Sequence, residues 1–180
     1  MNRSSMKRAI TIVLFGTAAS VFANAQTRLG VATGAMFPVY QATSLPSSRL
    51  INPEELVKVL ESSNGEKPLM IQVGSHVLYQ QAHIPGSEYI GPASSENGLQ
   101  SLRKRVESLP RNKFIVIYCG CCPWTHCPNV KPADDALRAM GFTNVRVLYF
   151  ANNFGTDWVD KGYPVGKGDY ETHFRLRSAY

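Results

Sequence analysis

Cysteine is absent from most of this chain, because all four cysteines lie between residues 119 and 127. A disulfide framework spreads its cysteines to close long loops, so this clustering excludes one and indicates chemistry or metal binding. The sequence also lacks a large excess of basic over acidic residues outside its N-terminus. Basic residues number 19 and acidic residues 13, and Arg3, Lys7 and Arg8 supply three of the basic ones. The remaining charges are too balanced to indicate nucleic acid as a partner.

The sequence has no uncharged segment suited to crossing a membrane. Residues 9–25 are the candidate, but their 17 residues fall short of the roughly 20 that a spanning helix needs. A basic start, an apolar middle and an Ala-Asn-Ala site ending at Ala25 are typical of a secretory signal peptide over residues 1–25. We therefore predict a periplasmic or secreted protein that begins at Gln26, with no stable membrane insertion after cleavage.

The rest of the chain has the composition of a globular domain. Hydrophobic residues make up 44% and charged residues 18% of the 180 residues, which is enough for a core and for about one domain. Residues 26–48 lack a clear periodicity and are interpreted as an N-terminal arm. Residues 167–180 are interpreted as a C-terminal tail.

Short apolar runs and helical spacings of apolar residues alternate from residue 49 onward. The runs predict buried strands, and the spacings, with Pro near their starts and Gly at their ends, predict helices. This alternation favours an α/β fold in which helices cover both faces of a mostly parallel sheet. The predicted elements are a helix from Pro53 that Asn64-Gly65 ends, a strand over 69–73, a helix over 99–109, a strand over 114–118, a helix over 132–140, a strand over 145–149 and a short helix over 156–161.

The cysteines lie in the loop that follows the strand predicted at 114–118. Open α/β folds bind their ligands at the carboxyl ends of parallel strands. Backbone N–H groups of the loop and of the next helix stabilise an anion there, so we expect a lowered pKa for Cys119. Cys119, the first residue after the strand, is the predicted nucleophile. The predicted substrate-binding residues of the loop are Gly120, Cys121, Cys122, Trp124 and His126.

Several segments, in matching order, resemble the rhodanese-like (thiosulfate sulfurtransferase) domain. The similar segments are residues 51–56, 69–74, Tyr79, Ala82-His83-Ile84-Pro85-Gly86-Ser87, Val116-Ile117-Tyr118-Cys119, 136–137, 141–145 and 158–165. The resemblance covers residues 49–166 and implies a three-layer domain. It implies that Cys119 takes sulfur from a small sulfur donor as a persulfide and passes it to a thiol or protein acceptor. Neither a cofactor nor a bound metal is expected.

Parts of this domain depart from the family pattern. Gln72 and Gly74 lie where the family usually has Asp and Arg, and no Arg occurs between Cys119 and Arg138. The 22 positions from Cys119 to Gly141 are several more than usual, so the loop is enlarged. A phosphate cradle needs a bidentate Arg in this loop, which disfavours a phosphatase. The identity of the sulfur donor is therefore left open.

Other classes of protein use such a loop as well. The Cys-x-x-Cys spacing of Cys119 and Cys122 is also typical of a thiol–disulfide redox protein. The thiolates, with His126, are a ligand set for a soft-metal module that binds copper or zinc, and a non-catalytic binding domain is a further reading. We predict that Cys122 or Cys127 either pairs with Cys119 on oxidation or relays its sulfur. His83, beside a Pro-Gly turn, is expected to hydrogen-bond the turn rather than to catalyse.

Overall fold

The computed structural model describes residues 44–169. The predicted signal peptide, most of the predicted arm and the tail from residue 170 onward lie outside the described residues. Within residues 44–169, no helix is both long enough and apolar enough to cross a membrane.

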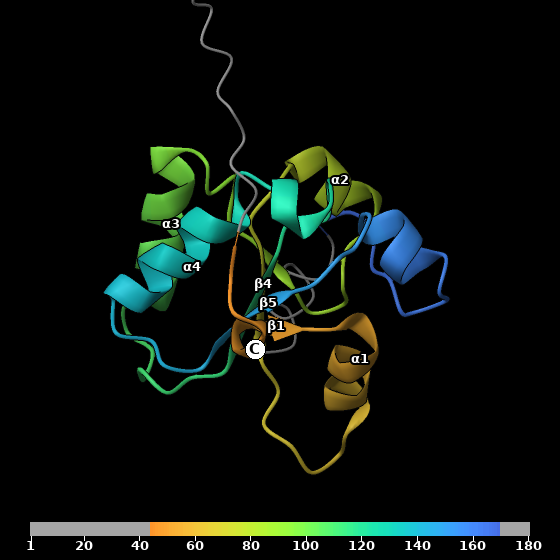
Figure 1. Ribbon diagram of the computed structural model, residues 1–180, viewed down its shortest axis with the longest axis horizontal. Coiled ribbons are helices and arrows are strands. Elements are labelled where there is room, and N and C mark those ends of the chain that lie inside the picture. Colours follow the sequence, from red (N-terminus) through yellow and green to blue (C-terminus); the bar gives the residue numbers. More distant parts are fainter. Residues whose placement is uncertain (1–43, 170–180) are drawn as a thin grey trace, which may run out of the picture. The chain divides into compact units, whose positions relative to one another are not determined.

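Five parallel strands form one sheet in the order β1-β5-β4-β2-β3, and Figure 1 labels β4, β5 and β1 at its centre. The strands are β1 (Leu50–Ile51), β2 (Leu69–Gln72), β3 (Glu88–Tyr89), β4 (Ile115–Tyr118) and β5 (Val145–Leu148). β4 lies between β5 and β2, and all four of its residues are buried. A strand buried on both faces is a continuous apolar run, which is why the sequence pattern reveals it. The predicted parallel sheet is confirmed.

Helices cover both faces of this sheet. Leu102 and Leu137 pack in the cluster on one face, and Leu56 and Trp158 pack in the cluster on the other. The first face therefore carries α3 and α4, which lie next to each other in Figure 1, and the second carries α1 and η3. The helical elements are η1 (Ser47–Arg49), α1 (Pro53–Glu61), α2 (His76–Gln81), α3 (Glu96–Val106), η2 (Trp124–His126), α4 (Val130–Ala139) and η3 (Gly155–Val159).

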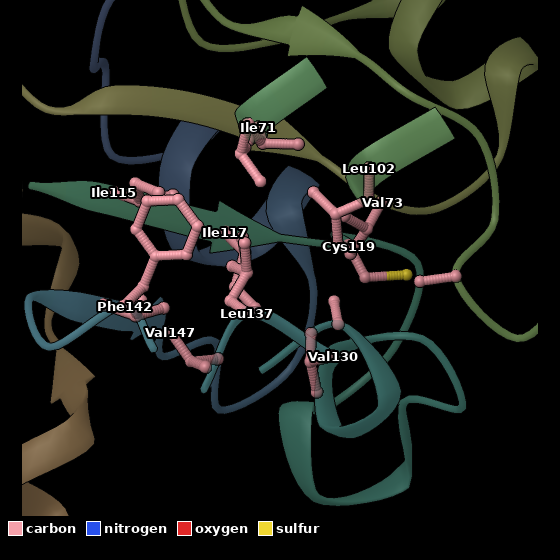
Figure 2. Packing of buried hydrophobic residues seen from close by; sticks show 14 of the residues in the cluster. Ile71, Val73, Leu102, Ile115, Ile117, Cys119, Val130, Leu137, Phe142 and Val147 are labelled. Carbon is pink, nitrogen blue, oxygen red and sulfur yellow. The ribbon is translucent and has the colours of Figure 1, made fainter. Parts of the chain in front are cut away.

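The alternation of side chains along β4 decides where the first cysteine points. Ile115, Ile117 and Cys119 belong to the cluster on the α3 and α4 face, and Figure 2 shows these three side chains in that cluster. Val116 and Tyr118 belong to the opposite cluster. Successive side chains of a strand point to opposite faces, so the position of Cys119 directs its sulfur toward the side of the sheet that α4 covers.

The elements differ from the sequence predictions at a few places. α4 begins at Val130, before the predicted start at Pro132, which now lies in the first turn, where its missing N–H costs no helical hydrogen bond. α2, with six residues, and β3, with two, were not predicted from periodicity, because neither is long enough to establish a repeat. η3 is a five-residue π-helical segment that begins at Gly155, slightly ahead of the predicted helix over 156–161.

Candidate active site

Cys119 lies directly after β4, and only 3% of its surface is exposed. The next residue, Gly120, turns the chain away from the sheet with a φ of +86°. A Cβ atom at Gly120 would lie 2.9 Å from the Cβ atom of Phe154. Only glycine satisfies both the left-handed backbone and this close approach, so Gly120 shapes the start of the loop.

Asn129, the residue that precedes α4, reaches the sulfur of Cys119. Its side-chain Nδ2 donates to Cys119 Sγ over 3.3 Å, and its Oδ1 accepts from the backbone N–H of Ser94 over 2.9 Å. Asn129 is buried, so both hydrogen bonds are shielded from water. The amide is thereby held in one orientation, with its N–H groups toward the cysteine.

Two residues at the end of β2 shape the other side of Cys119. Gln72 Nε2 donates to the carbonyl of Cys119 over 2.9 Å, and Gln72 Oε1 accepts from the N–H of Gly74 over 3.1 Å. A Cβ atom at Gly74 would lie 2.7 Å from Cys119 Sγ, closer than real Cβ contacts. The absence of a side chain at residue 74 therefore makes the room that the sulfur occupies.

The four thiols of the loop form one cluster. Cys119 Sγ and Cys121 Sγ are 3.2 Å apart, and Cys121 Sγ and Cys122 Sγ are also 3.2 Å apart. The sulfurs of Cys119, Cys121 and Cys127 all lie within 4.8 Å of one another. Cys119 and Cys127 are buried, whereas Cys121 is exposed, and all four are free thiols.

The hydrogen bonds in this cluster place its negative charge on Cys121. Hydrogen bonds from the thiols of Cys119, Cys127 and Cys122 lower the pKa of Cys121. The same hydrogen bond to Cys121, together with burial, raises the pKa of Cys119, against the opposing effect of a hydrogen bond with the Cys127 thiol. Hydrogen bonds to Cys119 and Cys121 raise the pKa of Cys127. The expected lowered pKa of Cys119 is therefore not found, because its thiol donates to a neighbouring sulfur.

A cavity of about 270 Å³ opens beside Cys119. Its wall combines apolar side chains with neutral polar ones, and no Lys, Arg, His, Asp or Glu among residues 44–169 lines it. Two larger cavities, of about 480 and 400 Å³, are lined by no cysteine. The residues that line the cavity beside Cys119 are Gln72, Leu78, Gln81, Ala82, Tyr118, Cys119, Gly120, Cys121, Asn153, Phe154, Gly155 and Val159.

Of the predicted substrate-binding residues, Gly120 and Cys121 line this cavity, and Cys122 contacts Cys121. Trp124 and His126 do not line it. The backbone N–H of Trp124 donates to the carbonyl of Phe150 over 3.0 Å, and its ring lies 5.8 Å from that of Tyr149. The His126 ring lies 3.0 Å from the hydroxyl of the preceding threonine. These contacts give both residues a place in the loop away from the cysteine.

His83 is buried and lies outside the cavity lining. Its Nδ1 atom lies 2.8 Å from the carbonyl of Tyr79. Its backbone N–H donates to the carbonyl of Gly166, whose own N–H donates back to the carbonyl of His83. The His83 ring thus bonds a carbonyl of α2 rather than the Pro-Gly turn, and the backbone pairing attaches the segment after η3 to the turn.

Sequence reasoning missed one residue and gave no role to two others. Asn129 was missed because the helix was expected to start at Pro132, although Asn is a common residue just before a helix. Gln72 and Gly74 were noted only as departures from the family pattern. Both contact Cys119 in the structure, since the missing side chain of Gly74 leaves space for Cys119 Sγ and Gln72 bonds the Cys119 carbonyl and the Gly74 N–H.

The fold and the position of the cysteine define a known class of domain. Residues 52–149, more than half of the chain, match the family described as Rhodanese-like domain. The chain therefore belongs to the rhodanese-like domain family, as its sequence motifs indicated. No curated protein was found to match the chain.

Solved structures with the same fold support this assignment. The crystal structure of the Alr3790 protein from Anabaena sp. is 20% identical, with a TM-score of 0.51, over 71% of this chain and 90% of that one. The BH2092 protein from Bacillus halodurans is 21% identical, with a TM-score of 0.50, over 67% of this chain and 77% of that one. A structure of EanB as a cysteine persulfide with ergothioneine is 22% identical, with a TM-score of 0.50, over 66% of this chain and 28% of EanB.

Proposed function

We propose that the protein is a sulfurtransferase or persulfide carrier in which Cys119 accepts the sulfur. The observation that carries this proposal is the position of Cys119 at the end of β4, on the wall of the cavity of about 270 Å³. The Asn129 amide and the Cys121 sulfur contact Cys119 Sγ at 3.3 and 3.2 Å. EanB, which has the same fold, has been captured as a cysteine persulfide.

Cys121 gives the buried nucleophile a proton acceptor. Cys121 Sγ lies 3.2 Å from Cys119 Sγ and is the hydrogen-bond partner to which the Cys119 proton passes as the Cys119 sulfur attacks. The Cys119 sulfur then attacks the outer sulfur of a donor R–S–SH. A new S–S bond forms at Cys119, the donor S–S bond breaks, and its electron pair leaves with the thiolate R–S⁻.

The second half of the reaction returns Cys119 to its starting state. A thiolate acceptor attacks the terminal sulfur of the Cys119 persulfide. The bond between the two persulfide sulfurs breaks, and Cys119 keeps the electron pair as a thiolate that regains its proton. The Asn129 Nδ2 donor lies where it stabilises the negative charge on sulfur in both half-reactions.

The composition of the cavity favours an organic persulfide over thiosulfate as the donor. Thiosulfate carries two negative charges, and a binding site for it needs cations or several charge-assisted donors. Within the part of the chain that the structure describes, no Lys, Arg or His lines the cavity beside Cys119. Leu78, Phe154 and Val159 instead offer apolar surface to the organic part of a persulfide.

Intact mass spectrometry tests the proposal. Reduced protein incubated with a small organic persulfide is expected to gain one sulfur atom, which a thiol acceptor then removes. Cys119→Ser is expected to abolish this gain, Cys121→Ser to slow it and Cys122→Ser to leave it measurable. If only Cys121→Ser failed to gain the sulfur atom, Cys121 rather than Cys119 would be the nucleophile. No gain in the wild type with any sulfane sulfur donor would refute the proposed function.

A thiol–disulfide redox protein is the second candidate, and the spacing of the sulfurs favours it. Cys121 Sγ and Cys127 Sγ both lie within 4.8 Å of Cys119 Sγ, near enough to form a disulfide after a small movement. A redox protein reduces a disulfide substrate without gaining sulfur from a persulfide. The mass experiment therefore separates the two functions, since only the redox protein ends the reaction with an internal disulfide and no added sulfur.

We further propose that the protein acts in the periplasm or outside the cell. The basic start, the apolar segment of residues 9–22 and the Ala-Asn-Ala site support cleavage after Ala25. N-terminal sequencing of the exported protein is expected to begin at Gln26. Recovery of the uncleaved chain in the membrane fraction would contradict this proposal.

A further inference from the structure

Three sulfurs of the loop surround a common point. Cys119 Sγ, Cys121 Sγ and Cys127 Sγ all lie within 4.8 Å of one another. A metal–thiolate bond is about 2.3 Å long, so three sulfurs around one ion in a plane are roughly 4 Å apart. The three sulfurs thus need to move by less than an atomic radius to bind one ion.

Separate elements of the fold position the cysteines of this group. β4 and the positive φ of Gly120 place Cys119 and direct the chain to Cys121. η2 returns the chain, and the backbone N–H of Cys127 donates to the carbonyl of Trp124 over 3.2 Å. Cys127 and Cys119 are both buried in the cluster under α4. Two of the three sulfurs therefore have fixed positions before any ion arrives.

The ligand types select a soft ion with three ligands. The three residues offer sulfur only, and thiolate sulfur favours copper(I), zinc and iron–sulfur clusters. Structural zinc is almost always four-coordinate. Among the described residues a fourth ligand is not in place, because Cys122 is not among the three mutually close thiols and the His126 ring bonds the neighbouring hydroxyl. Copper(I) is the ion that accepts three thiolates without a fourth ligand.

We propose that Cys119, Cys121 and Cys127 form a copper(I) site. Binding is not a redox step, since the copper enters and leaves as copper(I), Cys121 binds it as the thiolate, and the Cys119 and Cys127 thiols release their protons to the solvent. The site goes beyond the proposed sulfur transfer and does not rest on it. Because Cys119 takes part in both, a bound copper ion and a Cys119 persulfide exclude each other.

Competition with a chelator tests the site in the absence of any sulfur donor. The full chain, reduced and kept without oxygen, is titrated with copper(I) in the presence of bathocuproine disulfonate, whose copper complex is coloured. The wild type is expected to withdraw one copper ion per chain. Loss of even an outer partner weakens metal sites by about 10–100-fold, so Cys121→Ser and Cys127→Ser are expected to lower the affinity by more than about 100-fold.

Cys122→Ser is the matched control, because it removes a thiol of the same loop that is not one of the three ligands. It is expected to bind copper(I) as the wild type does, and X-ray absorption of the wild type is expected to show three sulfur ligands. Equal loss of affinity in Cys122→Ser, a shell with fewer than three sulfurs, or stronger binding of zinc(II) than of copper(I) would each overturn the proposal. These readouts are independent of sulfur transfer, so the site and the proposed function fail separately.

Discussion

Replacement of Gly74 by alanine tests directly whether the space beside Cys119 matters. The added Cβ atom would lie 2.7 Å from Cys119 Sγ, 3.1 Å from the Cys119 carbonyl oxygen and 3.2 Å from Gln72 Nε2. Gly74 is not among the glycines with positive φ, so alanine fits the backbone there. The whole effect of the substitution is therefore steric, and it acts on the sulfur and the two groups that hold the loop.

This steric overlap is expected to lower both the stability of the fold and the rate of sulfur gain. Overpacking a buried site costs about 1–3 kcal/mol, and each kcal/mol lowers the unfolding midpoint by about 2–4 °C in a chain of this size. Displacement of a reacting atom by about 1 Å slows a reaction by about 100-fold. We therefore expect Gly74→Ala to remain folded at 25 °C with a lower midpoint, and to gain sulfur about 100-fold more slowly.

Gly65→Ala is the matched control, since a Cβ atom at Gly65 would meet only the side chain of Ser62, at 3.5 Å. Thermal unfolding and the rate of sulfur gain by intact mass are measured for both variants and the wild type. Gly65→Ala is expected to match the wild type in both. If Gly74→Ala also matches it in both, the space beside Cys119 is not needed and our account of Gly74 is wrong.

Two further substitution experiments test the loop. Asn129→Asp keeps the oxygen that accepts from the Ser94 N–H but loses the donor to Cys119, so we expect it to keep most of the stability and to gain sulfur more slowly. Asn129→Ala loses both groups, so we expect slower sulfur gain and a free energy of unfolding lower by about 1–3 kcal/mol. Equal stability of the two variants would contradict the assignment of stability to the oxygen and of reactivity to the N–H donor. Oxidation is expected to abolish sulfur transfer by the wild type, because Cys119 forms a disulfide with one of the two thiols within 4.8 Å of it. Cys122→Ser is expected to lose activity at the same redox potential, because Cys122 is not one of those thiols. If Cys127 instead receives sulfur from Cys119, peptide mapping is expected to find the added sulfur on Cys127. Unchanged wild-type activity at every redox potential tested, with no disulfide detected by mass, would exclude control of activity by oxidation of Cys119.

Much of the fold follows from local patterns along the chain. The apolar run that forms β4 predicts a strand buried on both faces, and such a run needs no knowledge of its neighbours. Gly141 ends α4 with a φ of +87°, as its position after a helical spacing indicated. The alternation of strands and helices then predicts a parallel sheet. The six-residue helix α2 escapes this reasoning because tertiary packing rather than local propensity stabilises so short a helix.

The position of Cys119 and its loop could also be predicted from the sequence, whereas their surroundings could not. Cys119 follows the central strand in sequence, so its place at the carboxyl edge of the sheet was determined locally. The prediction that Trp124 and His126 bind substrate rested on nearness along the chain alone. The structure places their contacts with Phe150, Tyr149 and the preceding threonine, and their binding of substrate stays a prediction.

Only the tertiary structure decided what touches the sulfur and which thiol carries the charge. Gln72 lies opposite Tyr118 in the register of β2 and β4, and this register brings Gly74 against Cys119 although 45 positions separate them. The start of α4 brings Asn129 to the same sulfur. The turn at Gly120 brings Cys121 within hydrogen-bond distance, which lowers the pKa of Cys121 and raises that of Cys119. Contacts of a few ångströms between separate segments depend on strand register and helix position, and no local pattern encodes those.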